Sequence, residues 1–220
     1  MRNGWTRRLW AEVAGIYSAI LQHPFLVGLT DGRLDANAFA HYLIQDAYYL
    51  HDFARALSVV GSKAPSPADV GMFARHAVGI IDVELDLHAS LLSELGVANS
   101  DAVPVAPTTR AYTSYLLATA HGGTFVDGFA AVLPCYWIYA EVGTELVKRG
   151  SPDSRYQRWI DSYAGEEYQT VVAEVLALAD DVGRTLGPTE EARARAHFAT
   201  TARYEWMFWD AAWRREAWPV

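Results

Sequence analysis

The sequence predicts an all-α protein that forms one domain. First, residues that favour helix starts alternate with glycines that favour helix ends along most of the chain. Second, no segment of useful length shows the alternation of a strand, and no internal repeat is present. Third, the 220 residues are 51% hydrophobic and 20% charged, which is typical of a globular domain. We therefore expect a single domain over residues 1–220 with seven or more helices.

The first half of the chain contains two long predicted helices. Asp35 is expected to cap a helix that Gly61 ends. Ser66 and Pro67 form a strong start signal, because serine is a good capping residue and proline suits the first helical position. We expect this second helix to continue without a break as far as the stop at Gly96.

Helix start and stop signals also divide the second half of the chain. Each expected helix lies between a capping residue or proline and a glycine. The expected helices run from Thr108 or Thr109 to Gly122, from about residue 124 to Gly150, from Ser151-Pro152 to Gly165, and then as two further helices separated by Gly187-Pro188.

Composition and charge exclude several classes of partner. The net charge is -8 and Lys and Arg form no basic run, so we expect no nucleic-acid partner. Glu12 interrupts the apolar run near the N-terminus, and no stretch approaches the ~20 apolar residues of a membrane span, which argues against an export signal or membrane partner. A single cysteine cannot form an internal disulfide. We expect a soluble, cytoplasmic protein.

Familiar phosphate, nucleotide and metalloprotease motifs are absent. Glu84, Asp86 and His88 suggest a metal at first sight. However, di-iron helical bundles use two Glu-x-x-His motifs, and none of the seven histidines has Asp or Glu three residues before it. A site of thiolate ligands is disfavoured by the single cysteine. We therefore expect neither a metal nor another cofactor.

The segment "LPCYWIYAEVG" holds the only cysteine, Cys135, directly after Pro134. Proline inside a helix removes a backbone donor and costs ~3 kcal/mol relative to alanine. We therefore expect a kink beside Cys135, which frees a backbone carbonyl and redirects the side chains that follow. Cys135 is then either a reactive thiol or a small buried apolar residue, and the local pattern leaves both readings open.

Two acidic residues lie among aromatic residues at helical spacing. Asp46 shares a helical face with Tyr42 and Tyr49, where it needs a hydrogen-bonding partner, either a protein side chain or an amino-bearing ligand. Glu205 precedes Phe208 by one turn. Apolar surroundings raise the pKa of a glutamate, which suits a general acid, whereas an ion pair with Arg203 is the structural alternative.

These segments together resemble the TenA family, also called thiaminase II or aminopyrimidine aminohydrolase. The matching segments are "LQHPFLVGLTDGRLDANAFAHYLIQDAYYL", "PCYWIYAEVG", "YQRWIDSYAGEEY" and "YEWMFWDAAW", which are spread over nearly the whole chain. The P-C-x-W-x-Y-x-E-x-G run around Cys135 is the most specific of them. The resemblance implies a haem-oxygenase-like helical bundle that assembles as a homotetramer.

The resemblance also implies an activity. The expected reaction is hydrolysis of 4-amino-5-aminomethyl-2-methylpyrimidine to 4-amino-5-hydroxymethyl-2-methylpyrimidine and ammonia, and of thiamine to hydroxymethylpyrimidine and the thiazole alcohol, both in thiamine salvage. By similarity, Cys135 is the nucleophile and Glu205 the acid/base group. The implied substrate-binding residues are Asp46, Tyr49, Tyr112, Tyr139, Tyr163 and Phe208.

Two other functions remain open at this point. A haem- or metal-dependent oxygenase on the same fold would need an axial histidine or a carboxylate–histidine cluster. A non-catalytic pyrimidine-binding or regulatory protein would bind the ring without turnover. The chemistry of one thiol, one acid and a flat aromatic slot favours the hydrolase.

Overall fold

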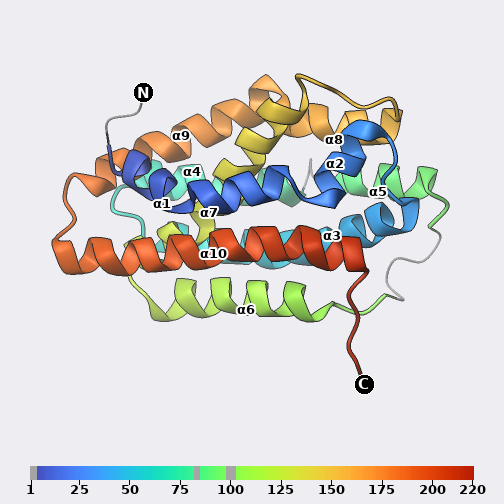
Figure 1. Cartoon of the computed structure of the whole chain (residues 1–220). Helices are drawn as coiled ribbons and strands as arrows, with labels where there is room; N and C mark the ends of the chain where they lie inside the picture. Colours follow the sequence, from blue (N-terminus) through green and yellow to red (C-terminus); the bar gives the residue numbers. More distant parts are fainter. Residues whose placement is uncertain (1–3, 82–84, 98–102) are drawn as a thin grey trace. The chain divides into compact units, whose positions relative to one another are not determined.

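The computed structural model describes residues 4–81, 85–97 and 103–220, which form ten α-helices and no strand (Figure 1). The all-α prediction is therefore confirmed. The helices are Trp5–Leu21 (α1), Pro24–Asp31 (α2), Ala36–Ser62 (α3), Pro67–Gly79 (α4), Leu85–Glu94 (α5), Pro107–Gly122 (α6), Phe125–Leu146 (α7), Ser154–Ala164 (α8), Glu166–Gly183 (α9) and Pro188–Arg214 (α10).

The chain divides into two compact units. Unit 1 comprises residues 1–33 and 130–206, and unit 2 comprises residues 34–129 and 207–220. One boundary lies between α2 and α3 and the other two fall inside α7 and α10, so each unit is built from segments that are distant in the sequence. The expectation of one domain over the whole chain stays a prediction.

Unit 1 is built around packing of α1 against α9 and of α8 against α2 and α9. Gly183 lets α9 approach α1 closely, because a Cβ at this position would lie 2.2 Å from the Cβ of Trp5. The Asp180 carboxylate accepts a hydrogen bond of 2.9 Å from the backbone N–H of Thr6, in the first turn of α1. This satisfies one of the donors that a helix N-terminus leaves unpaired, and it places α1 beside α9.

In unit 2, α3 packs against α4, α5 and α6. Gly61 was expected to end α3, and this prediction is wrong, because the helix continues to Ser62. Gly61 instead serves packing: a Cβ there would lie 2.7 Å from the Cβ of Phe73, so only glycine lets α4 come this close. Lys63, just beyond α3, donates to the backbone carbonyls of residues 120, 121 and 123 at the end of α6. The positive charge of Lys63 interacts favourably with the negative, C-terminal end of the α6 helix dipole.

The single helix expected between Ser66 and Gly96 is described as α4, the π-helical residues 80 and 81, and α5. The junction at residues 82–84 lies outside the described part, so the continuity of this helix stays a prediction. The start signal at Ser66 itself is confirmed, because its side chain accepts a hydrogen bond from the Asp69 N–H. Helix α6 begins at Pro107 without a local side-chain cap; the Thr108 N–H donates to Glu216 Oε2 at 2.7 Å instead.

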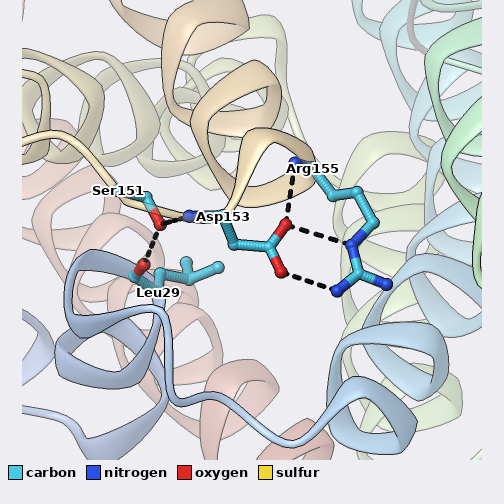
Figure 2. Close-up of polar contacts among 4 residues, drawn as sticks. All are labelled: Leu29, Ser151, Asp153 and Arg155. Atoms are coloured by element: carbon cyan, nitrogen blue, oxygen red, sulfur yellow. Dashed lines mark hydrogen bonds and ion pairs between the residues drawn. The ribbon is translucent and has the colours of Figure 1, made fainter.

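Helix α8 begins three residues later than its expected start signal at Ser151 (Figure 2). Asp153 caps the helix by accepting the Arg155 N–H at 2.9 Å, and the Arg155 guanidinium contacts both carboxylate oxygens. This arginine holds the pKa of the Asp153 carboxyl below its usual value. Ser151 has another role: its hydroxyl donates to the Leu29 carbonyl at 2.6 Å and so ties the start of α8 to α2.

Helix α7 is long and apolar enough to cross a membrane by length and composition, and α1 with α2, bent by 53°, passes the same test together. However, 89% of the apolar window of α7 is buried within the structure. A core helix has this composition because its whole circumference packs against protein. Burial therefore accounts for the apolar character of α7.

Candidate functional site

The residues that the sequence singled out are all buried, with none more than 8% exposed. Unit 1 contains Cys135 and Tyr139 on α7, Tyr163 on α8 and Glu205 on α10. Unit 2 contains Asp46 and Tyr49 on α3, Tyr112 on α6 and Phe208 on α10.

The residues that follow Cys135 in its motif contact one another or the adjacent helices. The Trp137 indole N–H donates to Glu141 Oε1 at 3.0 Å, one helical turn further along α7. Gly143 lets α7 approach the end of α8, because a Cβ there would lie 2.6 Å from the carbonyl carbon of Tyr163 and 2.7 Å from the amide nitrogen of Ala164. The motif therefore combines a chemically reactive residue type with the contacts that place its helix.

Backbone carbonyls of α7 accept hydrogen bonds from side chains of α1 and α9. The Tyr17 hydroxyl donates to the Glu141 carbonyl at 3.1 Å, and burial together with the Glu141 and Glu145 carboxylates raises the pKa of this phenol, which keeps it a donor. Tyr168 approaches the Cys135 and Tyr136 carbonyls at 3.5 and 3.4 Å. These contacts tie α7 to α1 and α9.

Gln169, also on α9, joins α7 to α8. Its amide donates to the Ala140 carbonyl at 3.1 Å and to the Tyr163 carbonyl at 2.9 Å. Helix α7 continues through Pro134 to Leu146, so this proline does not end the helix. The kink that proline is expected to cause stays a prediction.

An aromatic cluster lies beside this part of α7. The ring centroids of Tyr139 and Tyr163 are 4.8 Å apart, and Tyr163 meets Tyr168 edge-to-face at 5.1 Å. Trp159 closes the cluster at 4.9 Å from Tyr163. Tilted and edge-to-face pairs at these separations are favourable for aromatic rings and restrict their movement. The sequence had indicated Tyr139 and Tyr163, and the structure adds Tyr168 to them.

Glu205 lies on α10 and is only 1% exposed. Burial of a carboxylate is costly unless it is hydrogen-bonded or paired, so this residue type at this position points to a specific role. The Arg203 guanidinium, which the sequence offers as a partner, donates to the Ala199 carbonyl at 3.2 Å. The ion-pair alternative for Glu205 stays untested.

In unit 2, two tyrosines of α3 pack against aromatic residues of α6 and α10. Tyr49 packs against Tyr112 at a centroid distance of 4.9 Å and against Phe208 at 5.7 Å. Tyr42 meets Phe208 edge-to-face at 5.8 Å. The structure therefore brings together Tyr49, Tyr112 and Phe208, three of the residues that the family resemblance implied.

Asp46 lies within this aromatic group and is only 3% exposed. The Tyr42 hydroxyl donates to Asp46 Oδ2 at 3.0 Å. The same oxygen lies 3.5 Å from Nε2 of His88 on α5. Burial lowers the pKa of His88 to about 4 despite the nearby carboxylate, so this imidazole is neutral near pH 7.

Sequence reasoning did not assign His88 to the site. It considered this residue only with Glu84 and Asp86 as a metal ligand, and Glu84 lies outside the described residues. Within the described residues no group of three or more His, Cys, Asp or Glu is placed to hold a metal ion. The pairing of His88 with Asp46 depends on packing of α5 against α3, which no local pattern specifies.

Comparison with known proteins identifies relatives over nearly the full chain. A model of the TENA/THI-4/PQQC family matches residues 10–215. The chain is 34% identical over 214 residues to the aminopyrimidine aminohydrolase of Halalkalibacterium halodurans, covering 96% of both proteins. It is 37% identical over 212 residues to the thiamine biosynthesis multifunctional protein ThiED of Corynebacterium efficiens, where it spans 96% of this chain but only 28% of that protein.

Solved structures identify the fold. The TenA homologue protein from P. horikoshii OT3 matches with a TM-score of 0.86 and 32% identity, covering 96% of this chain and 99% of that one. A domain with a heme oxygenase-like fold from Shewanella denitrificans matches with a TM-score of 0.76 at 15% identity, over 96% and 92% of the two chains, which shows the fold alone. The chain thus has the haem-oxygenase-like helical fold and belongs to the TENA/THI-4/PQQC family.

Proposed function

We propose that this protein is an aminopyrimidine aminohydrolase of thiamine salvage. It hydrolyses 4-amino-5-aminomethyl-2-methylpyrimidine to the hydroxymethylpyrimidine and ammonia, and thiamine to the same pyrimidine and the thiazole alcohol. The observation that carries the proposal is the single cysteine of the chain, buried in α7 among aromatic residues within the P-C-x-W-x-Y-x-E-x-G motif. Family membership and the name of the H. halodurans relative support it.

The proposed chemistry uses the thiol to overcome the resistance of the pyrimidine to direct displacement at its side-chain methylene. Glu205 accepts the thiol proton, and the thiolate of Cys135 adds to a ring carbon while Glu205 delivers a proton to a ring nitrogen. The electron pair gained by the ring expels the side-chain aminomethyl nitrogen, which is protonated as an ammonium group and leaves as ammonia. Water then adds to the exposed methylene and releases one proton to solvent, the C–S bond breaks, and the ring nitrogen returns its proton to Glu205, which restores the thiol.

The remaining residues have binding roles in this proposal. The Asp46 carboxylate accepts hydrogen bonds from the amino group of the pyrimidine, which requires that its orientation be held. Tyr49, Tyr112, Tyr139, Tyr163 and Phe208 provide flat apolar surfaces for the ring. We also propose that the protein is cytoplasmic and homotetrameric and needs no metal or other cofactor.

Turnover of the two candidate substrates tests the proposal directly. Purified protein is incubated with aminomethylpyrimidine and, separately, with thiamine, and the hydroxymethylpyrimidine and ammonia or thiazole alcohol are quantified. We expect turnover by the wild-type protein and none by Cys135→Ser, because an alkoxide is far harder to form near neutral pH than a thiolate. Binding without turnover by the wild-type protein would instead support a non-catalytic function. Wild-type activity in the serine variant would contradict the covalent mechanism.

A further inference from the structure

His88 is a buried polar residue that the proposed reaction does not yet use. Its side chain is 1% exposed, and neither ring nitrogen has a hydrogen-bond partner within the described part of the chain. A buried polar group without a hydrogen bond destabilises the fold, so an apolar residue would serve packing alone better at this position. The polar atoms of His88 therefore call for a functional explanation.

The carboxylate of Asp46, a residue of the proposed site, lies beside His88. Nε2 of His88 lies 3.5 Å from Asp46 Oδ2, which also accepts the hydroxyl of Tyr42 at 3.0 Å. This separation exceeds the 2.7–3.2 Å typical of N–H···O hydrogen bonds. Hydrogen bonds at functional sites are often long before substrate binds and tighten in the complex. His88 is thus close enough to become the second donor to this oxygen after a small movement.

The protonation of the imidazole follows from its surroundings. A neutral imidazole carries one N–H donor and one acceptor nitrogen. The lone pair of an unprotonated Nε2 would be repelled by the carboxylate, so the proton resides on Nε2 and Nδ1 is the acceptor. Such a donor orients the carboxylate without adding a positive charge that would compete with an amino-bearing ligand.

We propose that His88 is a positioning residue, which together with Tyr42 holds the Asp46 carboxylate in the orientation that receives the amino group of a 4-aminopyrimidine. This inference rests on the role given to Asp46 in the proposed function. It assigns selectivity for the ring amino group to a pair of helices, α3 and α5, rather than to Asp46 alone. The predicted effect is on ligand affinity and not on the chemical step.

The test compares two variants of His88. His88→Leu has a similar volume and no donor, whereas His88→Gln places an amide N–H near the position of Nε2. Dissociation constants are measured by calorimetry for 4-amino-5-hydroxymethyl-2-methylpyrimidine and for its analogue with hydrogen in place of the 4-amino group. We expect His88→Leu to weaken binding of the aminopyrimidine by about 10- to 100-fold, the value of a hydrogen bond to a charged group, and to leave the analogue unaffected. His88→Gln should recover most of the lost affinity.

Kinetics and a double-mutant cycle separate positioning from packing. His88→Leu should raise KM for aminomethylpyrimidine with little change in kcat, and in the Asp46→Asn background it should have no further effect on affinity. Equal weakening of both ligands, or additive effects of the two substitutions, would overturn the inference. If the wild-type protein binds no aminopyrimidine, the proposed function itself fails; if it binds but Asp46→Asn is without effect, only the anchoring role and this inference fail.

A measurement on the wild-type protein covers the case in which the variants do not fold. The ¹⁵N chemical shifts of His88 should show a neutral imidazole protonated on Nε2, and this signal should move towards a stronger hydrogen bond when the hydroxymethylpyrimidine is added. A proton on Nδ1, or shifts that the ligand leaves unchanged, would overturn the inference.

Discussion

Replacement of Gly143 by alanine tests whether the close approach of α7 and α8 matters for the site. A Cβ at this position would lie 2.6 Å from the Tyr163 carbonyl carbon, whereas ordinary contacts of a Cβ begin near 3.4 Å. The backbone of α8 must therefore move away by about 0.8 Å, the difference between these distances. Backbone atoms cannot rotate aside as a side chain can, so the strain reaches Tyr163 directly.

Two effects of opposite sign determine the stability of this variant. Alanine favours the helix over glycine by about 1 kcal/mol. Overpacking against a fixed backbone costs typically ~1–3 kcal/mol. We expect a net loss of about 1 kcal/mol in the free energy of unfolding. The activity should fall further than the stability: if Tyr163 lines the pocket as proposed, a displacement near 1 Å reduces kcat/KM by about 10- to 100-fold.

The assay measures ammonia release from aminomethylpyrimidine and urea unfolding in parallel. Gly15→Ala is the matched control, because Gly15 is also inside a helix, α1, but is exposed and has no atom within 4 Å of an added Cβ. The control should gain about 0.5–1 kcal/mol of stability and keep full activity. A Gly143→Ala protein that is as stable as the control and retains activity within twofold of the wild type would refute the reasoning.

Three further predictions concern the acidic residues and His88. Glu205→Gln keeps the size of the side chain but cannot transfer a proton, so we expect a loss of roughly 10²–10⁴-fold in kcat at retained fold, measured by steady-state kinetics; near wild-type kcat would contradict the acid/base role. Asp46→Ala should raise the dissociation constant of the hydroxymethylpyrimidine by the equivalent of about 1–3 kcal/mol, with a smaller effect on single-turnover rates, and an unchanged affinity would make Asp46 structural. Because burial lowers the pKa of His88 from 6.5 to about 4, the unfolded state binds the extra proton between these values. The free energy of unfolding should therefore fall by about 3 kcal/mol between pH 6.5 and 4, and His88→Gln should lose this component in urea titrations at several pH values.

Local sequence specified those helix boundaries that depend on neighbouring residues. The cap at Asp35 accepts the N–H of Asn37, and the cap at Ser66 accepts that of Asp69, so each signal and its partner lie within three residues. The N-terminus of α6 has no local side-chain cap, and the Thr108 N–H is satisfied instead by Glu216, which is 108 residues away in the chain. Gly61 was misread as a helix end because only the packing of α4 reveals why a side chain is excluded there.

The same distinction applies to the site. The motif around Cys135 could be recognised from the sequence, since its residues lie within ten positions on one helix and Trp137 reaches Glu141 across a single turn. Tyr168 and His88 could not, because their contacts depend on which helices pack together, and helix packing is specified by side-chain shape over the whole interface rather than by local spacing. The sequence by itself thus determined the all-α class and the residues to which we assign the proposed chemistry. Tertiary packing alone decided which side chains of α1 and α9 donate to α7 and which imidazole faces the Asp46 carboxylate, because these pairs come together only when segments distant in the sequence pack against one another.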